Sequence, residues 1–277
     1  MPLAFSTLGC PGDSLDKVIA TAHAYGVTGL ELRAADGEFV HPRMPVTERR
    51  AVRSALAAEG LTVLALASYV KVCSPDPDEE VDGALRSAID LAADLGAANV
   101  RVFPGAGLPP QLDAAEPNAD LAAADARGAR RMTAASDHAR ARGVTLLLET
   151  HDSHPRGVDV ARLLELVPAD VPVKVIWDLM HPWRHGEDPD ATAAALAPWF
   201  AYPQFKDGVR AAEPNTVTLT LPGAGQLPLA HMLELVVGLA SAQGDVDPWL
   251  SLEWERAWHP KLPPLAEALA ALKTVLN

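Results

Sequence analysis

The chain has 277 residues, of which 49% are hydrophobic and 21% charged, and its formal net charge is −13 at pH 7. This length and balance predict one domain with a large buried core, close to the roughly 250 residues of an α/β barrel. The acidic charge, with no basic patch in the sequence, argues against nucleic acid as a partner.

Secretion and membrane insertion are not indicated either. The first residues lack a basic start followed by a long apolar run, and no apolar stretch reaches the ~20 residues that span a bilayer. The two cysteines, Cys10 and Cys73, do not form the pattern of a disulfide framework. We therefore expect a soluble cytoplasmic protein without a membrane partner.

Short apolar runs alternate with helical patterns from the start of the chain. The first four runs are rich in β-forming residues, and a glycine ends each helical pattern that follows the first three runs. The predicted strands are residues 3–7, 28–33, 61–68 and 98–104, and the helices between them are about 13–25, 47–59 and 78–95.

A Pro- and Gly-rich segment, residues 105–120, predicts a long loop of the kind that often binds ligands. After it, the alternation resumes. The predicted strands are 145–150, 171–178, 200–207 and 248–255, and the predicted helices are 121–142, 158–167, 189–197, 228–242 and 264–276.

Eight strand–helix units predict parallel strands with right-handed crossovers that close into a barrel. The predicted fold is therefore α/β, a single (β/α)8 TIM barrel over residues 1–277. An open doubly wound sheet is the alternative, but the first strand is not followed by a glycine-rich dinucleotide motif.

Four oxygen-bearing side chains stand at the ends of the last four predicted strands. They are Glu149 in TLLLET, Asp178 in VKVIWD, Gln204 in YPQFKD and Glu253 in WLSLEWE. One such acid is more often a capping or ion-paired group, but the carboxyl ends of barrel strands converge on one mouth. Equal placement on four strands predicts one divalent metal ion, and donors that are all oxygen favour Mn²⁺ or Mg²⁺ over Zn²⁺.

Several motifs resemble those of the xylose isomerase-like barrel family, which includes sugar epimerases, hydroxypyruvate isomerase, inosose-processing enzymes and endonuclease IV. These motifs are GLELR (29–33), LLLET (146–150), WDLMH (177–181), QFKD (204–207) and SLEWE (251–255), and the resemblance covers nearly the whole chain. It implies that the four strand-end residues are the metal ligands. The family usually has histidine where this chain has Gln204, although hydroxypyruvate-isomerase-like members also carry glutamine there.

The endonuclease IV branch of that family is disfavoured on two grounds. Its trinuclear zinc site needs additional histidines, whereas the third and fourth predicted strands end in LALAS and VRVFP without one. The net charge of −13 also opposes binding to DNA.

Residues near the strand ends are candidates for substrate contact. The resemblance implies that His181 contacts substrate oxygens near the metal, and Trp183 would give an apolar wall for a sugar ring. Arg210 would bind a hydroxyl or carboxylate group, or is a surface charge. Lys206 would orient Asp207 or bond to the ligand carboxylates.

Other polar residues have a less specific pattern. Glu31 and Arg33 alternate with leucines and so share one face of their strand, where we expect a structural role. His151, Asp152 and His154 belong to a polar loop for which we expect solvation and not a second metal, and one of them is a candidate for the pocket lining. The turn PGAGQLP (222–228) resembles a family turn but is weak evidence for an anion site.

We predict a divalent-metal-dependent isomerase or epimerase of a keto-sugar or polyol. The metal would stabilise an enediolate, while Glu149 and Glu253 remove and return the proton from opposite sides of the mouth. Expulsion of a β-hydroxyl would instead give a lyase, either a dehydratase or a C-glycoside-cleaving enzyme, and a non-catalytic sugar-binding subunit is the remaining alternative. The resemblance favours a homodimer or homotetramer.

Overall fold

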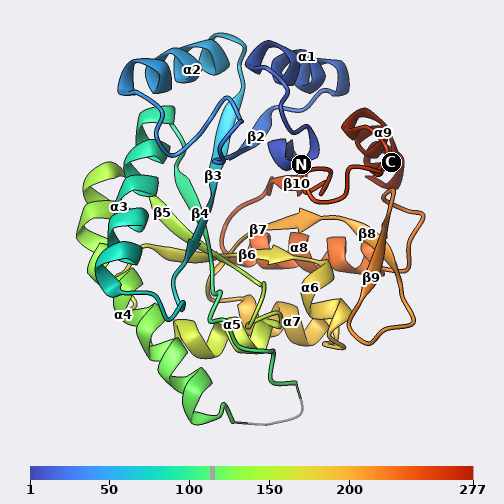
Figure 1. Cartoon of the computed structure of the whole chain (residues 1–277). Helices are drawn as coiled ribbons and strands as arrows, with labels where there is room; N and C mark the ends of the chain where they lie inside the picture. The colour runs from blue at the N-terminus through green and yellow to red at the C-terminus, as the bar shows by residue number, and fades with distance from the viewer. Residues whose placement is uncertain (113–115, 277) are drawn as a thin grey trace.

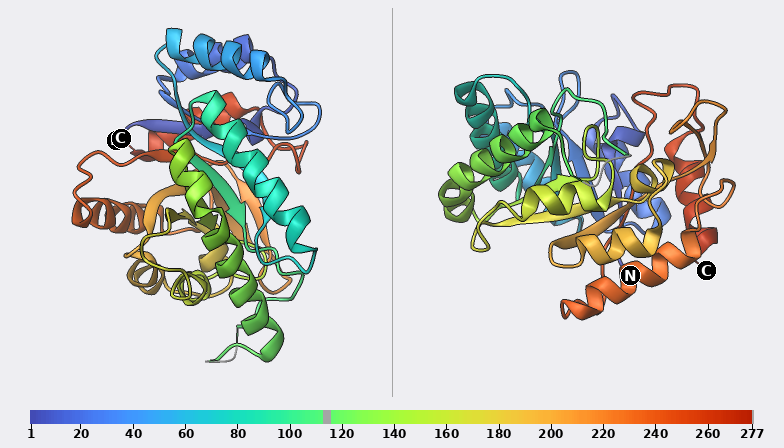
Figure 2. Two further views of the ribbon diagram at one scale, coloured as in Figure 1. Left: turned by 90° about the vertical axis from the view of Figure 1, so that its left-hand side faces the viewer. Right: turned by 90° about the horizontal axis from the view of Figure 1, so that it is seen from below.

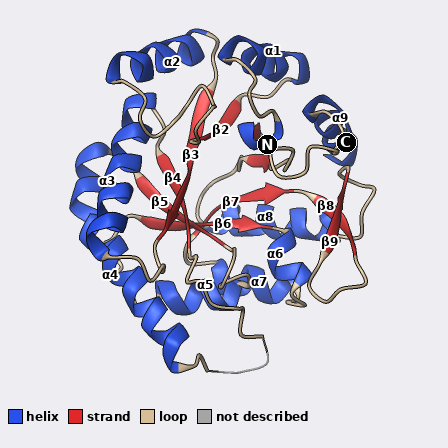
Figure 3. Cartoon of the chain, in the orientation of Figure 1, coloured by secondary structure: helices blue, strands red, loops and turns tan. Residues whose placement is uncertain are grey.

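In the computed structural model, which describes residues 1–112 and 116–276, eight parallel strands close into a barrel ringed by helices (Figures 1 and 3). Each strand pairs with the next one along the chain, and the last pairs with the first. The strands are β1 (Leu3–Ser6), β2 (Gly29–Arg33), β3 (Thr62–Lys71), β4 (Asn99–Phe103), β5 (Thr145–Glu149), β6 (Val173–Asp178), β7 (Phe200–Phe205) and β10 (Leu250–Leu252). The predicted (β/α)8 barrel is confirmed.

The helices cover the outside of the barrel and begin and end close to the predicted positions (Figure 2). Local signals fix their ends: the Ser14 side chain accepts a hydrogen bond from the Lys17 amide, and Gly26 at φ 63° closes the same helix. The helices are α1 (Leu15–Tyr25), α2 (Val46–Ala58), α3 (Asp78–Leu95), α4 (Ala119–Arg142), α5 (Gly157–Leu164), α7 (Pro189–Leu196), α8 (Leu229–Ala242) and α9 (Leu265–Leu276). None of those in the described ranges is long and apolar enough to cross a membrane.

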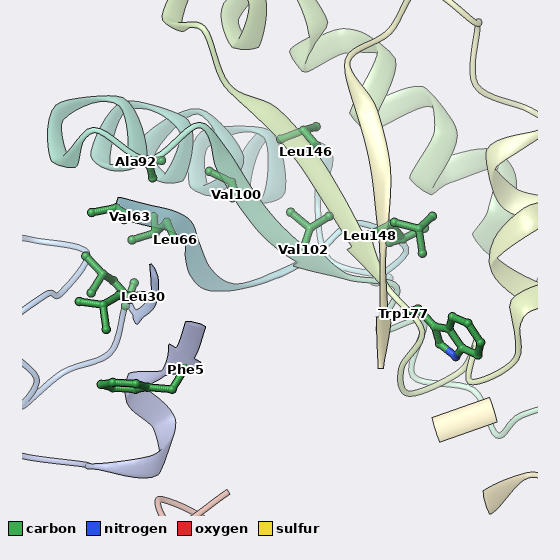
Figure 4. Close-up of a cluster of buried hydrophobic side chains, with 14 of the residues drawn as sticks. Phe5, Leu30, Val63, Leu66, Ala92, Val100, Val102, Leu146, Leu148 and Trp177 are labelled. Carbon is green, nitrogen blue, oxygen red and sulfur yellow. The ribbon is translucent and has the colours of Figure 1, made fainter. Parts of the chain in front are cut away.

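The core has two layers because successive strand residues point to opposite faces. Leu146 and Leu148 of β5 point outward into the large core between strands and helices, whereas Leu147 points into the barrel with the smaller inner cluster. Part of the outer core is drawn in Figure 4, with Val100, Val102, Leu146 and Leu148 on the strands and Ala92 on α3. By the same alternation, Glu149 lies on the inner face.

Three features differ from the predicted elements. An antiparallel hairpin, β8 (Asp207–Arg210) with β9 (Val217–Thr220), is inserted after β7, and a short helix, α6 (Met180–Arg184), follows β6. The eighth barrel strand is shorter than predicted, so that Glu253 comes directly after its end. The predicted loop 105–120 has no regular helix before α4 in its described part, and residues 113–115 lie outside the described residues.

Candidate active site

The four predicted ligands form one layer at the carboxyl end of the barrel. In β5, β6 and β7 each candidate ligand stands two residues beyond a residue of the inner cluster, which contains Leu147, Ile176 and Tyr202. Oxygens of three carboxylates in this layer lie within 4.8 Å of one another. The side chains of the layer, all buried, are Glu149, Asp178, Gln204 and Glu253.

Two oxygens of this layer have no hydrogen-bond donor among the described residues. Oε2 of Glu149 and Oε1 of Gln204 are buried and accept no hydrogen bond, although Nη1 of Arg101 lies 3.4 Å from the glutamate, whereas Oδ2 of Asp178 is ion-paired with Nζ of Lys206 at 2.6 Å. Buried acceptors without donors are rare in folded proteins and costly. A divalent cation bound to these oxygens would supply the missing partner, so the donor set fits such an ion.

Glu31 on β2 fixes the amide of Gln204. The Gln204 Nε2 donates to Glu31 Oε2 at 3.0 Å, and the hydroxyl of Tyr202 donates to the same oxygen at 3.0 Å. The hydroxyl of Ser251 donates to the other oxygen of Glu31. The amide nitrogen of Gln204 therefore faces Glu31, and its Oε1 accepts no hydrogen bond from the described residues. Glu31 therefore acts by positioning Gln204.

Arg101 on β4 was missed by the sequence reasoning. Its buried guanidinium lies between the two glutamates, with Nη1 3.2 Å from Glu253 Oε1 and 3.4 Å from Glu149 Oε2. Its Nη2 also donates to the backbone oxygen of Ser68 at 3.1 Å. One signal was present, because Arg101 is the single charged residue of the strand NVRVF.

Lys206 is the second buried cation of the mouth. Its Nζ lies 2.6 Å from Asp178, 2.5 Å from Glu253 and 2.6 Å from Glu255. Burial alone would lower the pKa of Lys206, but these carboxylates outweigh burial and hold it well above its ordinary value. Of the two contacts considered for Lys206, the structure shows the one with ligand carboxylates.

The pKa values of Glu149 and Asp178 are shifted toward the protonated forms. Burial raises the pKa of Glu149 well above its ordinary value, and the neighbouring charges of Glu253 and Asp178 raise it further against the opposing effect of Arg101 and Lys206. Burial likewise raises the pKa of Asp178. The result is a carboxylate at the mouth that accepts a proton more readily than a solvated glutamate does.

A cavity of about 170 Å³ opens above the carboxylates. His181 is buried in its wall, with Nε2 3.7 Å from Asp178 Oδ2 and with Nδ1 lacking a partner, and its ring lies 4.5 Å from that of His151. Burial and then the His151 ring hold the pKa of His181 well below its ordinary value, so His181 is neutral at pH 7. The lining residues are Leu8, Tyr69, Arg101, Phe103, Glu149, His151, His181, Arg184, Glu253, Glu255 and Trp258.

Trp183 and Arg210 lie beside the cavity and not in its lining. The guanidinium of Arg210 lies 3.9 Å from the ring centre of Trp183. It also donates to the backbone oxygens of Trp183 at 2.5 Å and of Arg184 at 3.1 Å. These two residues therefore hold the last turn of α6, which carries Arg184 to the cavity wall.

A model of the xylose isomerase-like TIM barrel family matches residues 19–275. The chain belongs to this family. No curated protein matches it in sequence.

Three solved structures share the fold of this protein, and the similarity covers nearly the whole length of both chains. The probable 3-DHS dehydratase AsbF of Bacillus anthracis is 18% identical with a TM-score of 0.74, covering 100% of this chain and 99% of its own. The IolI protein, solved with a zinc atom, is 16% identical with a TM-score of 0.76, covering 100% and 96%. D-psicose 3-epimerase from Clostridium cellulolyticum H10 is 14% identical with a TM-score of 0.75, covering 99% and 98%.

In this xylose isomerase-like barrel, the glycine-rich turn before α8 already holds an anion of its own. The carboxylate of Asp207 accepts from the backbone amides of Gly223 at 2.9 Å, Gly225 at 2.9 Å and Leu227 at 3.2 Å. Backbone amides that converge in this way are a common anion site. Because Asp207 uses them, the turn does not offer these donors to a phosphate.

The polar loop after β5 is not uniformly solvated, and that prediction is wrong for His154. Its side chain is fully buried, with Nε2 2.6 Å from Asp125 Oδ1 and Nδ1 2.9 Å from the hydroxyl of Ser153. A buried aspartate from α4 draws His154 inward, because each group satisfies the other. His151, three residues earlier, lines the cavity instead.

Proposed function

We propose that this family member is a divalent-metal-dependent isomerase or epimerase of a small keto-sugar or polyol. The observation that carries the proposal is the layer of four buried side chains at the barrel mouth, in which Glu149 and Gln204 each present an oxygen that accepts no hydrogen bond from the described residues. Oxygen donors favour one Mn²⁺ or Mg²⁺ ion. Because the solved IolI protein contains zinc, the identity of the ion bound by this protein must be measured directly.

A divalent cation at these oxygens would act as a Lewis acid that stabilises negative charge on the two oxygens of a hydroxy-ketone. Glu149, which lines the cavity, would remove the proton from the hydroxyl-bearing carbon next to the carbonyl. Glu253 would return a proton, since it reaches the cavity from β10, three strands away from β5. Return to the neighbouring carbon gives isomerisation, and return to the opposite face gives epimerisation.

The remaining residues of the mouth would orient these groups and the substrate. Arg101 holds the two glutamates from one side, and Lys206 holds Glu253 from the other. The neutral His181 would bind or polarise a substrate oxygen. Trp183 and Arg210 would contribute indirectly, through the turn of α6 that they support.

A lyase is a second candidate, favoured by the pair of imidazoles in the cavity wall. His151 and His181 face the cavity with ring centres 4.5 Å apart, and a proton donor there could assist the departure of a β-hydroxyl group. The first step, proton removal by a carboxylate, is shared with the isomerase. The two functions therefore differ in product, because only the lyase releases water.

The test is elemental analysis of the purified protein beside a Glu149→Ala, Glu253→Ala double variant. We expect about one Mn or Mg per chain in the parent and none in the double variant. A matched control is Glu213→Ala, Glu234→Ala, which removes two exposed acids and should leave the metal in place. Ketoses and inososes are then screened with that metal, by NMR for an epimer and by mass spectrometry for loss of water.

Two results would contradict the proposal. Failure to bind metal after reconstitution with Mn²⁺ would remove the basis for the reaction and favour a sugar-binding subunit. About three zinc ions per chain would instead indicate the nuclease branch of the family.

A further inference from the structure

Arg184 differs from the other cations at the cavity. Arg101 pairs with two glutamates, Lys206 with three carboxylates, and Arg33, which lies over the ring of Trp258, with Glu38 at 2.5 Å. Within residues 1–112 and 116–276 the side chain of Arg184 makes no ion pair, and its Nε is buried without a hydrogen-bond partner. Because Arg184 is half-buried and lines the cavity, its guanidinium is placed to bind an anion there.

The fold holds Arg184 in place for such an anion. Its backbone oxygen accepts a hydrogen bond from Arg210, and the same guanidinium packs on Trp183 one residue earlier. His181, on the same helix, presents Nδ1 without a partner. The cavity is therefore lined both by polar groups of α6 without a partner and by carboxylates that already have cationic partners.

We propose that the substrate carries a carboxylate group and that Arg184 binds it. This inference rests on the proposed function and names its substrate class: a small polyhydroxy keto-acid. The planar guanidinium matches a carboxylate through two parallel hydrogen bonds. The carboxylates of Glu149, Glu253 and Glu255 would repel an anionic group placed beside them, so the substrate has one orientation.

A carboxylate fits this wall better than a phosphate does. A phosphate monoester brings about −1.5 to −2 charges at pH 7, against one guanidinium and close to three acids. The glycine-rich turn of this barrel, where convergent amides would assist a phosphate, is filled by Asp207. The cavity of about 170 Å³ also favours a small substrate.

The test compares two probes, D-gluconate and D-glucitol, which differ in a single carboxylate. Their affinities for the Mn²⁺-loaded protein are measured by titration calorimetry. We expect the parent to bind gluconate about 10- to 100-fold more tightly, the effect of a charged hydrogen-bonded pair. Arg184→Gln should lower the gluconate affinity to that of glucitol without changing glucitol, and Arg184→Lys should keep part of the preference.

A matched control is Arg43→Gln, which removes an exposed arginine whose side chain is 77% accessible and should change neither affinity. Thermal melts establish that the Arg184 variants are folded. A parent that binds gluconate no better than glucitol, including one that binds neither, overturns the proposal. A preference for gluconate that persists in Arg184→Gln also overturns the proposal, because the carboxylate of gluconate would then bind the metal and not Arg184.

Failure of the proposed function has a different signature. If the proposed function fails, elemental analysis of the same samples finds no metal in the parent. If only the carboxylate inference fails, the metal is bound and the preference for gluconate is absent.

Discussion

Two clusters of buried charge in this barrel have opposite hydrogen-bonding states. One is the mouth layer of Glu149, Asp178, Gln204 and Glu253. The other, the α4–α5 cluster, consists of Asp125, His154, Arg156, Asp159 and Arg162. In the α4–α5 cluster every carboxylate oxygen and both ring nitrogens have a partner within 3.0 Å, and the Nη2 of Arg162 is the atom left without one. In the mouth layer Oε2 of Glu149 and Oε1 of Gln204 accept no hydrogen bond from the described residues.

We infer from this difference that the α4–α5 cluster stabilises the fold, whereas the mouth layer serves the function. A fully paired buried network rigidifies the fold, and here it ties two helices and the loop after β5 together. A buried network with missing hydrogen bonds lowers the stability, and it persists where a bound ligand supplies the missing partners. The comparison therefore predicts opposite responses when a buried acid of each cluster is neutralised.

The largest expected effect is in the α4–α5 cluster. Asp125→Asn removes the charge that binds both His154 and Arg162, and should lower the free energy of unfolding by about 1.5–3 kcal/mol at pH 7. Urea denaturation measures the change. The control Asp137→Asn alters a 96% exposed side chain paired with Arg140 and should change stability by less than about 0.5 kcal/mol.

The same variant has a predicted pH dependence. Burial raises the pKa of Asp125, but hydrogen bonds from His154 and Arg162 outweigh it, so the folded pKa lies below the unfolded value of about 3.9. The stabilisation is therefore fully present above the unfolded pKa and is lost as the pH falls through the folded pKa. The difference between parent and variant should shrink below about pH 4, and an undiminished difference at pH 3 would contradict the ion-pair account.

The next effect concerns Glu31, which supports the mouth layer from below. Glu31→Leu removes the acceptor that orients Gln204 and should weaken Mn²⁺ binding about 10- to 100-fold, measured by calorimetry. Ser251→Ala removes a different donor to Glu31 and leaves the amide contact intact, so it should weaken binding less. Equal affinity in Glu31→Leu and the parent would show that Gln204 needs no such support.

The smallest effect is a gain in stability at the mouth. Because the folded pKa of Glu149 is raised, its ionised form destabilises the metal-free protein at neutral pH, and this penalty disappears as the pH falls toward the unfolded pKa. Glu149→Gln should therefore raise the free energy of unfolding in EDTA by about 0.5–2 kcal/mol, while Arg101 keeps Glu253 as its partner. Thermal and urea unfolding measure the change, with Glu234→Gln as an exposed control. A loss of stability in Glu149→Gln would contradict this account.

The sequence alone determined the barrel and the layer of four oxygen donors. Strand–helix alternation, the glycines that end helices and the two-residue period of strands are local properties, and parallel strands deliver their ends to one mouth whatever the remaining contacts are. For this reason Glu149, Asp178, Gln204 and Glu253 were found without coordinates. The same local patterns did not reveal the β8–β9 hairpin, since a short antiparallel insertion leaves the strand–helix repeat unchanged.

Only the tertiary structure decided which other side chains complete the mouth. Arg101 meets Glu253 across 152 residues of chain, and Glu31 meets Gln204 across 173, distances over which no sequence period carries information. Arg210 was predicted to contact substrate, but it lies on the inserted hairpin. There it donates hydrogen bonds to the end of α6, and Arg184 of that helix lines the cavity instead. Barrel closure sets these contacts, because it brings strands that are neighbours neither in sequence nor in the sheet to face one another across the mouth.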